Sequence, residues 1–159
     1  MHRLLRTAVF LVGDRHAAED LVQISLERTA RHWRRIGGDN PEAYSRKVLV
    51  NLAIDRGKKL KRGRDLPIGD AADLDLLRSA APRPDGADTD ADATGDLAAG
   101  LAALPARQRA VIVLRYWCDL DEREIADTLG ISAGSVKTHA SRALKALHGR
   151  LTSTREVAR

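Results

Sequence analysis

The chain has little cysteine and few aromatic residues: Cys118 is its only cysteine, and it has two Trp, two Tyr and one Phe in 159 residues. A single cysteine excludes a disulfide framework and any zinc site built on cysteines. So few aromatic rings do not suit a protein that stacks successive bases of single-stranded nucleic acid on aromatic platforms. Cys118 stands among Tyr116, Trp117 and Leu120, so we interpret it as a buried small hydrophobic residue rather than a nucleophile.

Long hydrophobic runs are also missing. The most apolar run near the N-terminus, residues 8–12, is far shorter than a membrane span and ends at Gly13. No small-residue cleavage pattern follows it. We therefore expect no contact with a membrane and a cytoplasmic location.

Recognisable catalytic motifs are absent. The five histidines, at positions 2, 16, 32, 139 and 148, are scattered and form no HExxH motif. The chain has no phosphate-binding glycine loop and no serine in a GxSxG elbow. The sequence therefore predicts a protein that is not an enzyme and that has no metal site and no cofactor.

The chain does have enough apolar residues for a core, at 43% of the sequence, and a length that suits one ordinary domain or two small ones. Its formal net charge is +5 and its pI is about 9.8, which favours a polyanionic partner. The charge is uneven: residues 1–62 carry 14 basic and 7 acidic side chains, residues 63–96 carry 3 and 9, and residues 97–159 carry 10 and 6.

The acidic stretch 63–96 is rich in Asp, Ala, Gly and Pro, and its apolar residues form only short islands. Such a composition does not bury enough surface to offset the entropy of ordering. We predict an all-α protein with two small helical domains, residues 1–62 and 97–151, joined by this flexible linker and followed by a tail, 152–159. The linker is either a solvated spacer or an acidic strand that occupies a basic channel of a partner.

Three helices are predicted in the N-terminal block. The first spans about residues 2–12 and ends at Gly13, the second begins after a cap at Asp14 and continues to about Arg35, and the third begins at Asn40-Pro41 and continues to about Arg62. The helical period places on the core face of the second helix Ala18, Leu21, Val22, Ser25, Leu26, Thr29 and Trp33.

Asp20, Gln23, Ile24 and Glu27 lie on the opposite side of that helix. A polar outer face is usually only solvated, but an exposed isoleucine beside carboxylates indicates a docking surface. The third helix is apolar nearly all round, which predicts burial on several sides or cover by a partner. Within it, we favour an internal hydrogen-bonded pair for Asn51 and Asp55.

Six of the nine residues from Arg56 to Arg64 are basic. Basic side chains at a helix C-terminus complement the helix dipole, but six are more than that role needs, so we predict phosphate contacts.

A helix-turn-helix is the strongest pattern in the C-terminal block. After short helices at about 97–104 and from Pro105 onward, Ala126, Gly130 and Val136 have the spacing of a helix crossing, a turn and a buried β-branched residue. Ser132 is the predicted cap of the second helix. Side chains from its N-terminal turns are expected to contact base edges or phosphates in the major groove: Ala133, Gly134, Ser135, Lys137, Thr138, Ser141 and Arg142. His139 is either a further base contact, a phosphate contact or a solvated residue.

Three segments together resemble a known family. AEDLVQ (18–23), NLAIDR (51–56) and LPARQRAVIVLRYWCDLDEREIADTLGISAGSVKTHASRALKAL (104–147) are similar to the extracytoplasmic-function (group IV) sigma factors of bacterial RNA polymerase, in the sigma-70 family, especially those of the sigma-E type from high-GC actinobacteria. The resemblance covers both basic blocks in order and nearly all of the chain except the linker.

The resemblance implies a transcription initiation factor with a role for each part. Residues 1–62 would be region 2, whose Asp20, Gln23, Ile24 and Glu27 would bind the clamp of the largest subunit of core RNA polymerase. The loop 37–40 with Asn40, and then Asn51, Arg56, Lys58 and Lys59, would contact promoter DNA at the −10 element. The acidic linker would thread the polymerase toward the RNA path.

Residues 97–151 would be region 4, which would contact the flap of the second-largest subunit and place its last helix in the major groove of the −35 element. The resemblance also admits an anti-sigma factor as a partner. Family members usually carry a further stretch before the equivalent of His2, so we expect this chain to begin inside region 2, with a trimmed start or a short first helix.

Two other classes compete with this interpretation. An operator-binding regulator not associated with core polymerase would share the C-terminal motif, but it needs a ligand or phospho-acceptor domain and a dimer interface, and neither is visible. A DNA-processing enzyme such as a resolvase needs a nucleophilic Ser or Tyr among clustered arginines. Tyr44 and Tyr116 both lie in apolar helical patterns instead.

Overall fold

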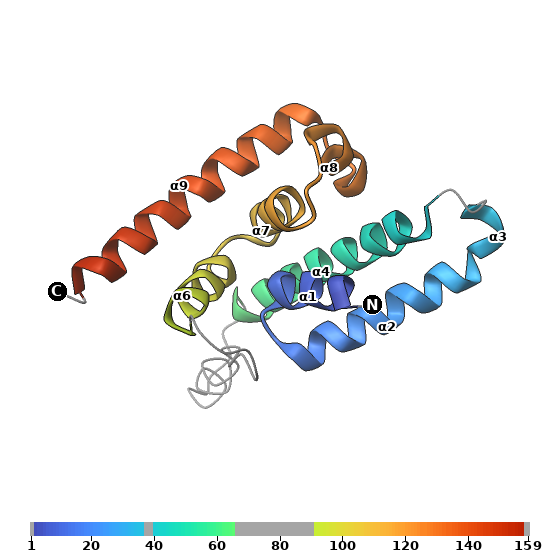
Figure 1. Ribbon diagram of the computed structural model, residues 1–159, viewed down its shortest axis with the longest axis horizontal. Coiled ribbons are helices and arrows are strands. Elements are labelled where there is room, and N and C mark those ends of the chain that lie inside the picture. Colours follow the sequence, from blue (N-terminus) through green and yellow to red (C-terminus); the bar gives the residue numbers. More distant parts are fainter. Residues whose placement is uncertain (1, 37–39, 66–90, 158–159) are drawn as a thin grey trace.

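The computed structural model describes residues 2–36, 40–65 and 91–157. Within these ranges the ordered elements are all helices, which confirms the predicted all-α class (Figure 1). They are α1 (His2–Val12), α2 (Arg15–Arg31), α3 (Trp33–Ile36), α4 (Pro41–Asp65), α6 (Ala91–Ala102), α7 (Ala106–Ile112), the π-helical turn η1 (Val113–Trp117), α8 (Glu122–Leu129) and α9 (Ala133–Val157). The predicted loop residues 37–39 and linker residues 66–90 lie outside the described residues, whereas α4 and α6 extend into the two ends of the stretch 63–96.

Local signals in the sequence place the helix boundaries of the N-terminal block. Gly13 ends α1 with a φ of 75°, in the left-handed region that glycine adopts without strain. The carboxylate of Asp14 then accepts from the backbone N–H of Ala17 at 2.7 Å, and the amide oxygen of Asn40 accepts from that of Ala43 at 2.9 Å. These are the two caps that the sequence predicts.

The second predicted helix is wrong in its extent and in part of its core face. Helix α2 ends at Arg31, and the chain then turns into the short α3. At the cap residue His32 the backbone N–H donates to the carbonyl oxygens of Arg28 and Ala30, and the ring Nδ1 lies 2.9 Å from the carbonyl oxygen of Arg28. Trp33 therefore lies in α3 with 57% of its surface exposed, and Leu26 is 37% exposed. The rest of the predicted face is buried, and the hydroxyls of Ser25 and Thr29 donate to backbone carbonyls.

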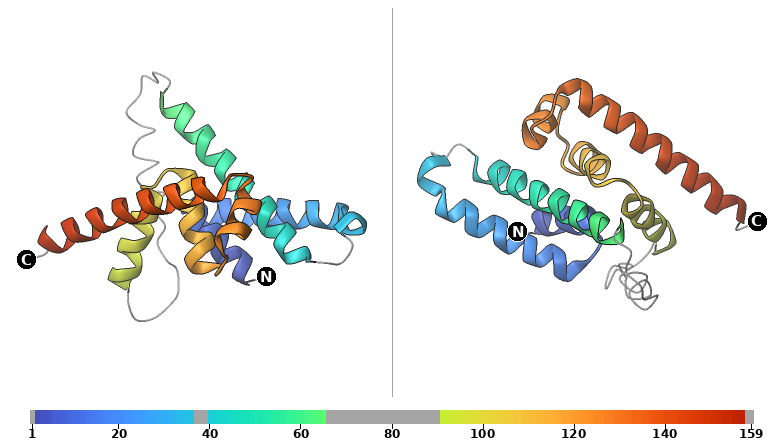
Figure 2. Two further views of the ribbon diagram at one scale, coloured as in Figure 1. Left: turned by 90° about the horizontal axis from the view of Figure 1, so that it is seen from above. Right: turned by 180° about the vertical axis from the view of Figure 1, so that it is seen from behind.

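Helix α4 is the centre of the molecule. It packs against α1 and α2 on one side and against α7 and α8 on the other, as Figures 1 and 2 show from opposite directions. Leu49 and Val50 are fully buried, and Ala53 and Ile54 are nearly so. The prediction of a helix buried on several sides is confirmed, and the cover comes from this chain itself.

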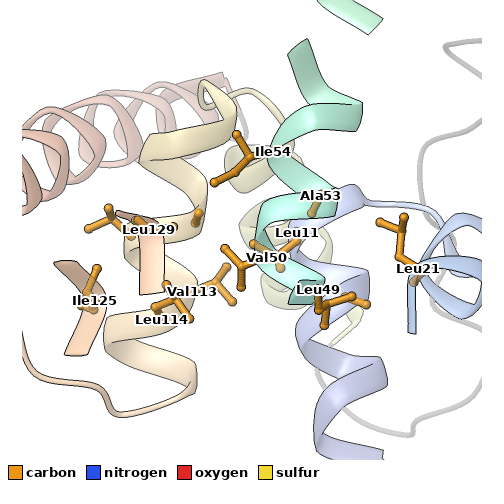
Figure 3. Packing of buried hydrophobic residues seen from close by; sticks show 14 of the residues in the cluster. Leu11, Leu21, Leu49, Val50, Ala53, Ile54, Val113, Leu114, Ile125 and Leu129 are labelled. Atoms are coloured by element: carbon orange, nitrogen blue, oxygen red, sulfur yellow. The ribbon is translucent and has the colours of Figure 1, made fainter. Parts of the chain in front are cut away.

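One hydrophobic core joins the N-terminal and the C-terminal blocks. It contains Leu11 and Leu49 from the first block together with Leu114, Ile125 and Leu129 from the second. Figure 3 shows Val50 of α4 beside Val113 of η1, at the junction of the two blocks. A domain of roughly 60 residues is only marginally stable alone, and here each block covers apolar surface of the other.

Three close contacts hold this junction together. The guanidinium of Arg109 donates through Nη1 to the carbonyl oxygen of Leu11 at 2.7 Å. The rings of Phe10 and Trp117 meet edge to face with centroids 5.0 Å apart. At Gly57 a Cβ atom would lie 2.9 Å from the Cβ of Ala106, so only glycine allows α4 and α7 to approach this closely.

The helix-turn-helix has the predicted geometry. Asp121 and Glu124 form a reciprocal capping box at the start of α8. Gly130 ends α8 with a φ of 63°, and the hydroxyl of Ser132 accepts from the backbone N–H of Ser135 at 3.1 Å to cap α9. Ile125 and Val136 are fully buried where the two helices cross.

Candidate protein and nucleic-acid interfaces

The predicted docking residues lie together on the outer face of α2, called here the α2 face: Asp20, Gln23, Ile24 and Glu27. All four are exposed, and the spacing of three and four residues aligns them along the helix. The side-chain amide of Gln23 donates to the carboxylate of Glu27 at 3.2 Å. Ile24 is 38% exposed among these polar groups. The α2 face is therefore an open polar surface with an apolar residue within it.

The residues predicted to contact the −10 element all lie on α4 or at its start, and all are exposed: Asn40, Asn51, Arg56, Lys58 and Lys59. They do not form one site, because 19 residues of helix separate Asn40 from Lys59, about 28 Å. Lys58 lies on nearly the same face as Asn51, whereas Arg56 is rotated by roughly 140° from Asn51.

Asn51 does not form the internal pair with Asp55 that we favoured from the sequence. Its amide nitrogen donates to the carbonyl oxygen of Lys47 at 2.9 Å and lies 3.5 Å from that of Thr128 in α8. Asp55 is exposed. Both residues border a shallow open groove on α4, and the side chains that line it are Arg28, Tyr44, Lys47, Val48, Asn51, Leu52 and Asp55.

The residues predicted to contact the −35 element lie on the first three turns of α9, called here the α9 face: Ala133, Gly134, Ser135, Lys137, Thr138, Ser141 and Arg142. Ser135 is half-buried and the others are exposed. Two of the hydroxyls already have hydrogen-bond partners nearby: that of Ser135 bonds with the cap residue Ser132 at 2.9 Å, and that of Thr138 donates to the carbonyl oxygen of Gly134 at 3.0 Å. Lys145 is not among the residues predicted from the sequence, although its spacing from Ser141 and Arg142 places it on the same exposed side.

One carboxylate lies among the basic side chains of this region. Glu122, the first residue of α8, has one oxygen 3.6 Å from Nζ of Lys137 and the other 3.8 Å from Nη1 of Arg115. Lys137 is thus the one residue of the predicted −35 set for which the described structure has an acidic neighbour at ion-pair distance.

Burial changes the chemistry of His139 and Cys118. Desolvation, helped by the positive charges of Arg107 and Arg142, lowers the pKa of His139. This shift favours the neutral imidazole, which disfavours a role as a cationic phosphate contact. Burial raises the pKa of the Cys118 thiol, whose sulfur lies 3.7 Å from Oγ1 of Thr7. Cys118 is half-buried rather than fully buried, and its raised pKa suits a packing role rather than a nucleophile.

No three His, Cys, Asp or Glu side chains in residues 2–36, 40–65 and 91–157 gather closely enough to hold a metal ion. A cavity beside Cys118 and Trp117 has a volume of about 20 Å³, enough for one water molecule. None of the described helices has the length and apolar character that a bilayer span requires.

Family models match both halves of the chain. Sigma-70 region 2 matches residues 1–63, and sigma-70 region 4 matches residues 95–147. The first contains the α2 face and nearly all of α4, and the second contains the helix-turn-helix.

Curated and solved relatives agree with these matches. The chain is 35% identical to the RNA polymerase sigma-E factor of Streptomyces antibioticus, over 97% of this chain and 81% of that protein. It is 34% identical to the ECF RNA polymerase sigma factor SigL of Mycobacterium tuberculosis, over 91% and 80%. The fold is similar to that of the sigma factor RpoE in complex with the anti-sigma factor NepR from Bartonella quintana, with a TM-score of 0.65, 25% identity and cover of 94% and 89%. The chain therefore belongs to the extracytoplasmic-function sigma factors of the sigma-70 family.

Proposed function

We propose that this sigma factor binds core RNA polymerase through the α2 face and directs it to promoters, with α4 at the −10 element and the α9 face at the −35 element. The observation that carries the proposal is that these three surfaces are exposed on three different helices while the two blocks share one core. Residues 1–62 then act as region 2 and residues 97–151 as region 4. The protein acts in the cytoplasm as a non-catalytic subunit of the polymerase.

We also propose a path for the linker and an inhibitory partner for the chain. Residues 63–96 carry an excess of acidic side chains, which suits a segment that follows a basic channel of the polymerase toward the RNA path. The related Bartonella sigma factor forms a complex with an anti-sigma factor, and we infer an inhibitory partner of that kind for this chain.

Co-elution with bacterial core RNA polymerase on a sizing column tests the proposal without knowledge of the promoter. We expect a stoichiometric complex with the wild-type chain. Absence of a complex, also with any upstream coding sequence restored, would favour the operator-binding regulator.

Replacement of both Asp20 and Gln23 by alanine is expected to weaken this complex at least tenfold. Both side chains are exposed on α2, and their loss leaves the hydrophobic core of the sigma factor intact. The affinity for core polymerase is measured by titration of labelled sigma factor. Asp127→Ala, an exposed change of the same charge on α8, is the control. Equal loss of core binding and of −35 duplex binding in the double variant would contradict the docking assignment.

Lys137→Ala and Arg142→Ala separate base contacts from phosphate contacts on the α9 face. A side chain that reads a base is expected to cost about 1–3 kcal/mol at the matching duplex and to relax specificity at one position. A phosphate contact instead weakens binding to all duplexes and reduces the salt dependence by about one counterion. The measurement is binding to duplexes selected by the wild-type holoenzyme from a random library, and unchanged affinity in both variants would contradict the −35 assignment.

A further inference from the structure

The carboxylate of Glu122 lies at ion-pair distance from side chains of two other elements in the helix-turn-helix region. The carboxylate begins α8, Lys137 comes from α9 and Arg115 from η1. The side chains of Glu122, Lys137 and Arg115 are 34%, 68% and 40% exposed, so all three are accessible from solvent.

The pairs contribute little to the stability of the fold. An exposed ion pair contributes about 0.2–1 kcal/mol, and the capping of α8 belongs to Asp121 and Glu124 rather than to Glu122. The carboxylate has a larger effect on the binding of a polyanion to the neighbouring surface. It repels phosphates, and it competes with them for the same ammonium and guanidinium groups.

We propose that Glu122 is a specificity-determining residue of −35 recognition. Its carboxylate positions Lys137 and Arg115, and it weakens binding to DNA in which the protein contacts phosphates but no matching bases. This inference rests on the proposed role of the α9 face. Glu122 acts through its two basic neighbours and is a positioning residue.

The two kinds of DNA complex respond differently to such a carboxylate. Affinity for an unrelated duplex comes almost entirely from the attraction between basic side chains and phosphates. No base contact offsets the repulsion from a carboxylate at the interface, so the whole of that repulsion lowers the affinity. A matched duplex also gains from a lysine whose ammonium group the neighbouring carboxylate biases toward one position, since less side-chain entropy is lost when the contact forms. The carboxylate therefore widens the difference between matched and unmatched DNA.

Glu122→Gln tests the proposal, since glutamine keeps the shape and leaves the capping box in place. The α9 face is exposed in the packed molecule, so the whole chain can be used. Fluorescence anisotropy is measured on two 20-base-pair duplexes over a range of salt concentrations. One carries the sequence that the wild-type chain selects from a random library, and the other carries the same bases scrambled.

We expect the variant to bind the scrambled duplex about two- to fivefold more tightly, the factor that corresponds to an exposed ion pair. The slope of log K against log salt should steepen by about one to two, because Lys137 and Arg115 become free to neutralise phosphates. The ratio of matched to scrambled affinity should fall by at least the same factor. An unchanged ratio would overturn the proposal, even if both duplexes were bound more tightly.

Two further variants isolate the cause. Glu19→Gln also removes one negative charge and one ion pair, that between Glu19 and Arg15 at 3.1 Å on α2, and it should leave the ratio unchanged. With Lys137→Met already present, Glu122→Gln should lose most of its effect on the ratio, and a full effect there would contradict positioning through Lys137. A wild-type chain that does not distinguish the two duplexes would overturn the −35 assignment itself and the inference with it. Thermal unfolding confirms that each variant is folded.

Discussion

Replacement of Leu49 or of Leu114 by alanine is expected to destabilise both halves of the protein together, by about 2–5 kcal/mol in each case. Leu49 lies on α4 and Leu114 on η1, and both are fully buried in the hydrophobic cluster that the two blocks share. Each substitution removes three carbon atoms from well-packed surroundings and leaves a cavity that the helices close only in part. Because the core is continuous, a cavity on either side weakens the packing of the other.

Differential scanning calorimetry of the full chain distinguishes one cooperative unit from two. We expect one unfolding transition in the wild type, moved to lower temperature by either substitution. Leu60→Ala is the matched control, since Leu60 is also on α4 but is 47% exposed. A substitution at such a site usually changes the free energy of unfolding by no more than about 0.5 kcal/mol. Two separate transitions, of which each variant moves only one, would contradict the shared core.

The sequence predicts the local structure better than the packing of the two blocks. Gly13, Asp14 and Asn40 determine helix ends through their own backbone and side-chain bonds, which do not depend on distant residues. The apolar surface of α4 predicts cover but does not identify it. A partner protein, or the C-terminal block of the same chain, would require the same pattern around Val50 and Ile54.

In the candidate sites, too, the sequence predicts local features better than contacts between distant elements. Helical spacing brings the α2 face together correctly, and the helix-turn-helix follows from its small and apolar positions. The pairing of Lys137 with Glu122 depends on how three elements meet in space, so spacing along one helix does not reveal it. For Asn51, the carbonyl oxygen of Thr128 lies 77 residues away in the chain, and only the packing of α8 on α4 brings it near.

Arg109 links the two blocks through hydrogen bonds, in addition to the apolar core that they share. Its guanidinium donates to the carbonyl oxygens of Leu11 at 2.7 Å, Ala102 at 2.8 Å and Leu104 at 3.0 Å. Leu11 is in the last turn of α1 and Ala102 ends α6, where carbonyl groups have no partner within their own helices. Desolvation by burial lowers the pKa of Arg109, yet an arginine stays charged at physiological pH. One cation therefore satisfies helix ends from both blocks.

Arg109→Met is expected to lower the free energy of unfolding by about 2–4 kcal/mol, because methionine keeps much of the stem but leaves three carbonyl groups without a charged donor. Arg109→Lys should lose less, since a single ammonium group replaces only part of the planar fork. Urea unfolding measures the loss, and Arg107→Met, an exposed neighbour on α7, is the control. Small-angle X-ray scattering should show a larger radius of gyration for Arg109→Met than for the control, because the bond between α7 and α1 is lost. If both methionine variants have the same stability and the same radius, the junction is held by apolar packing alone.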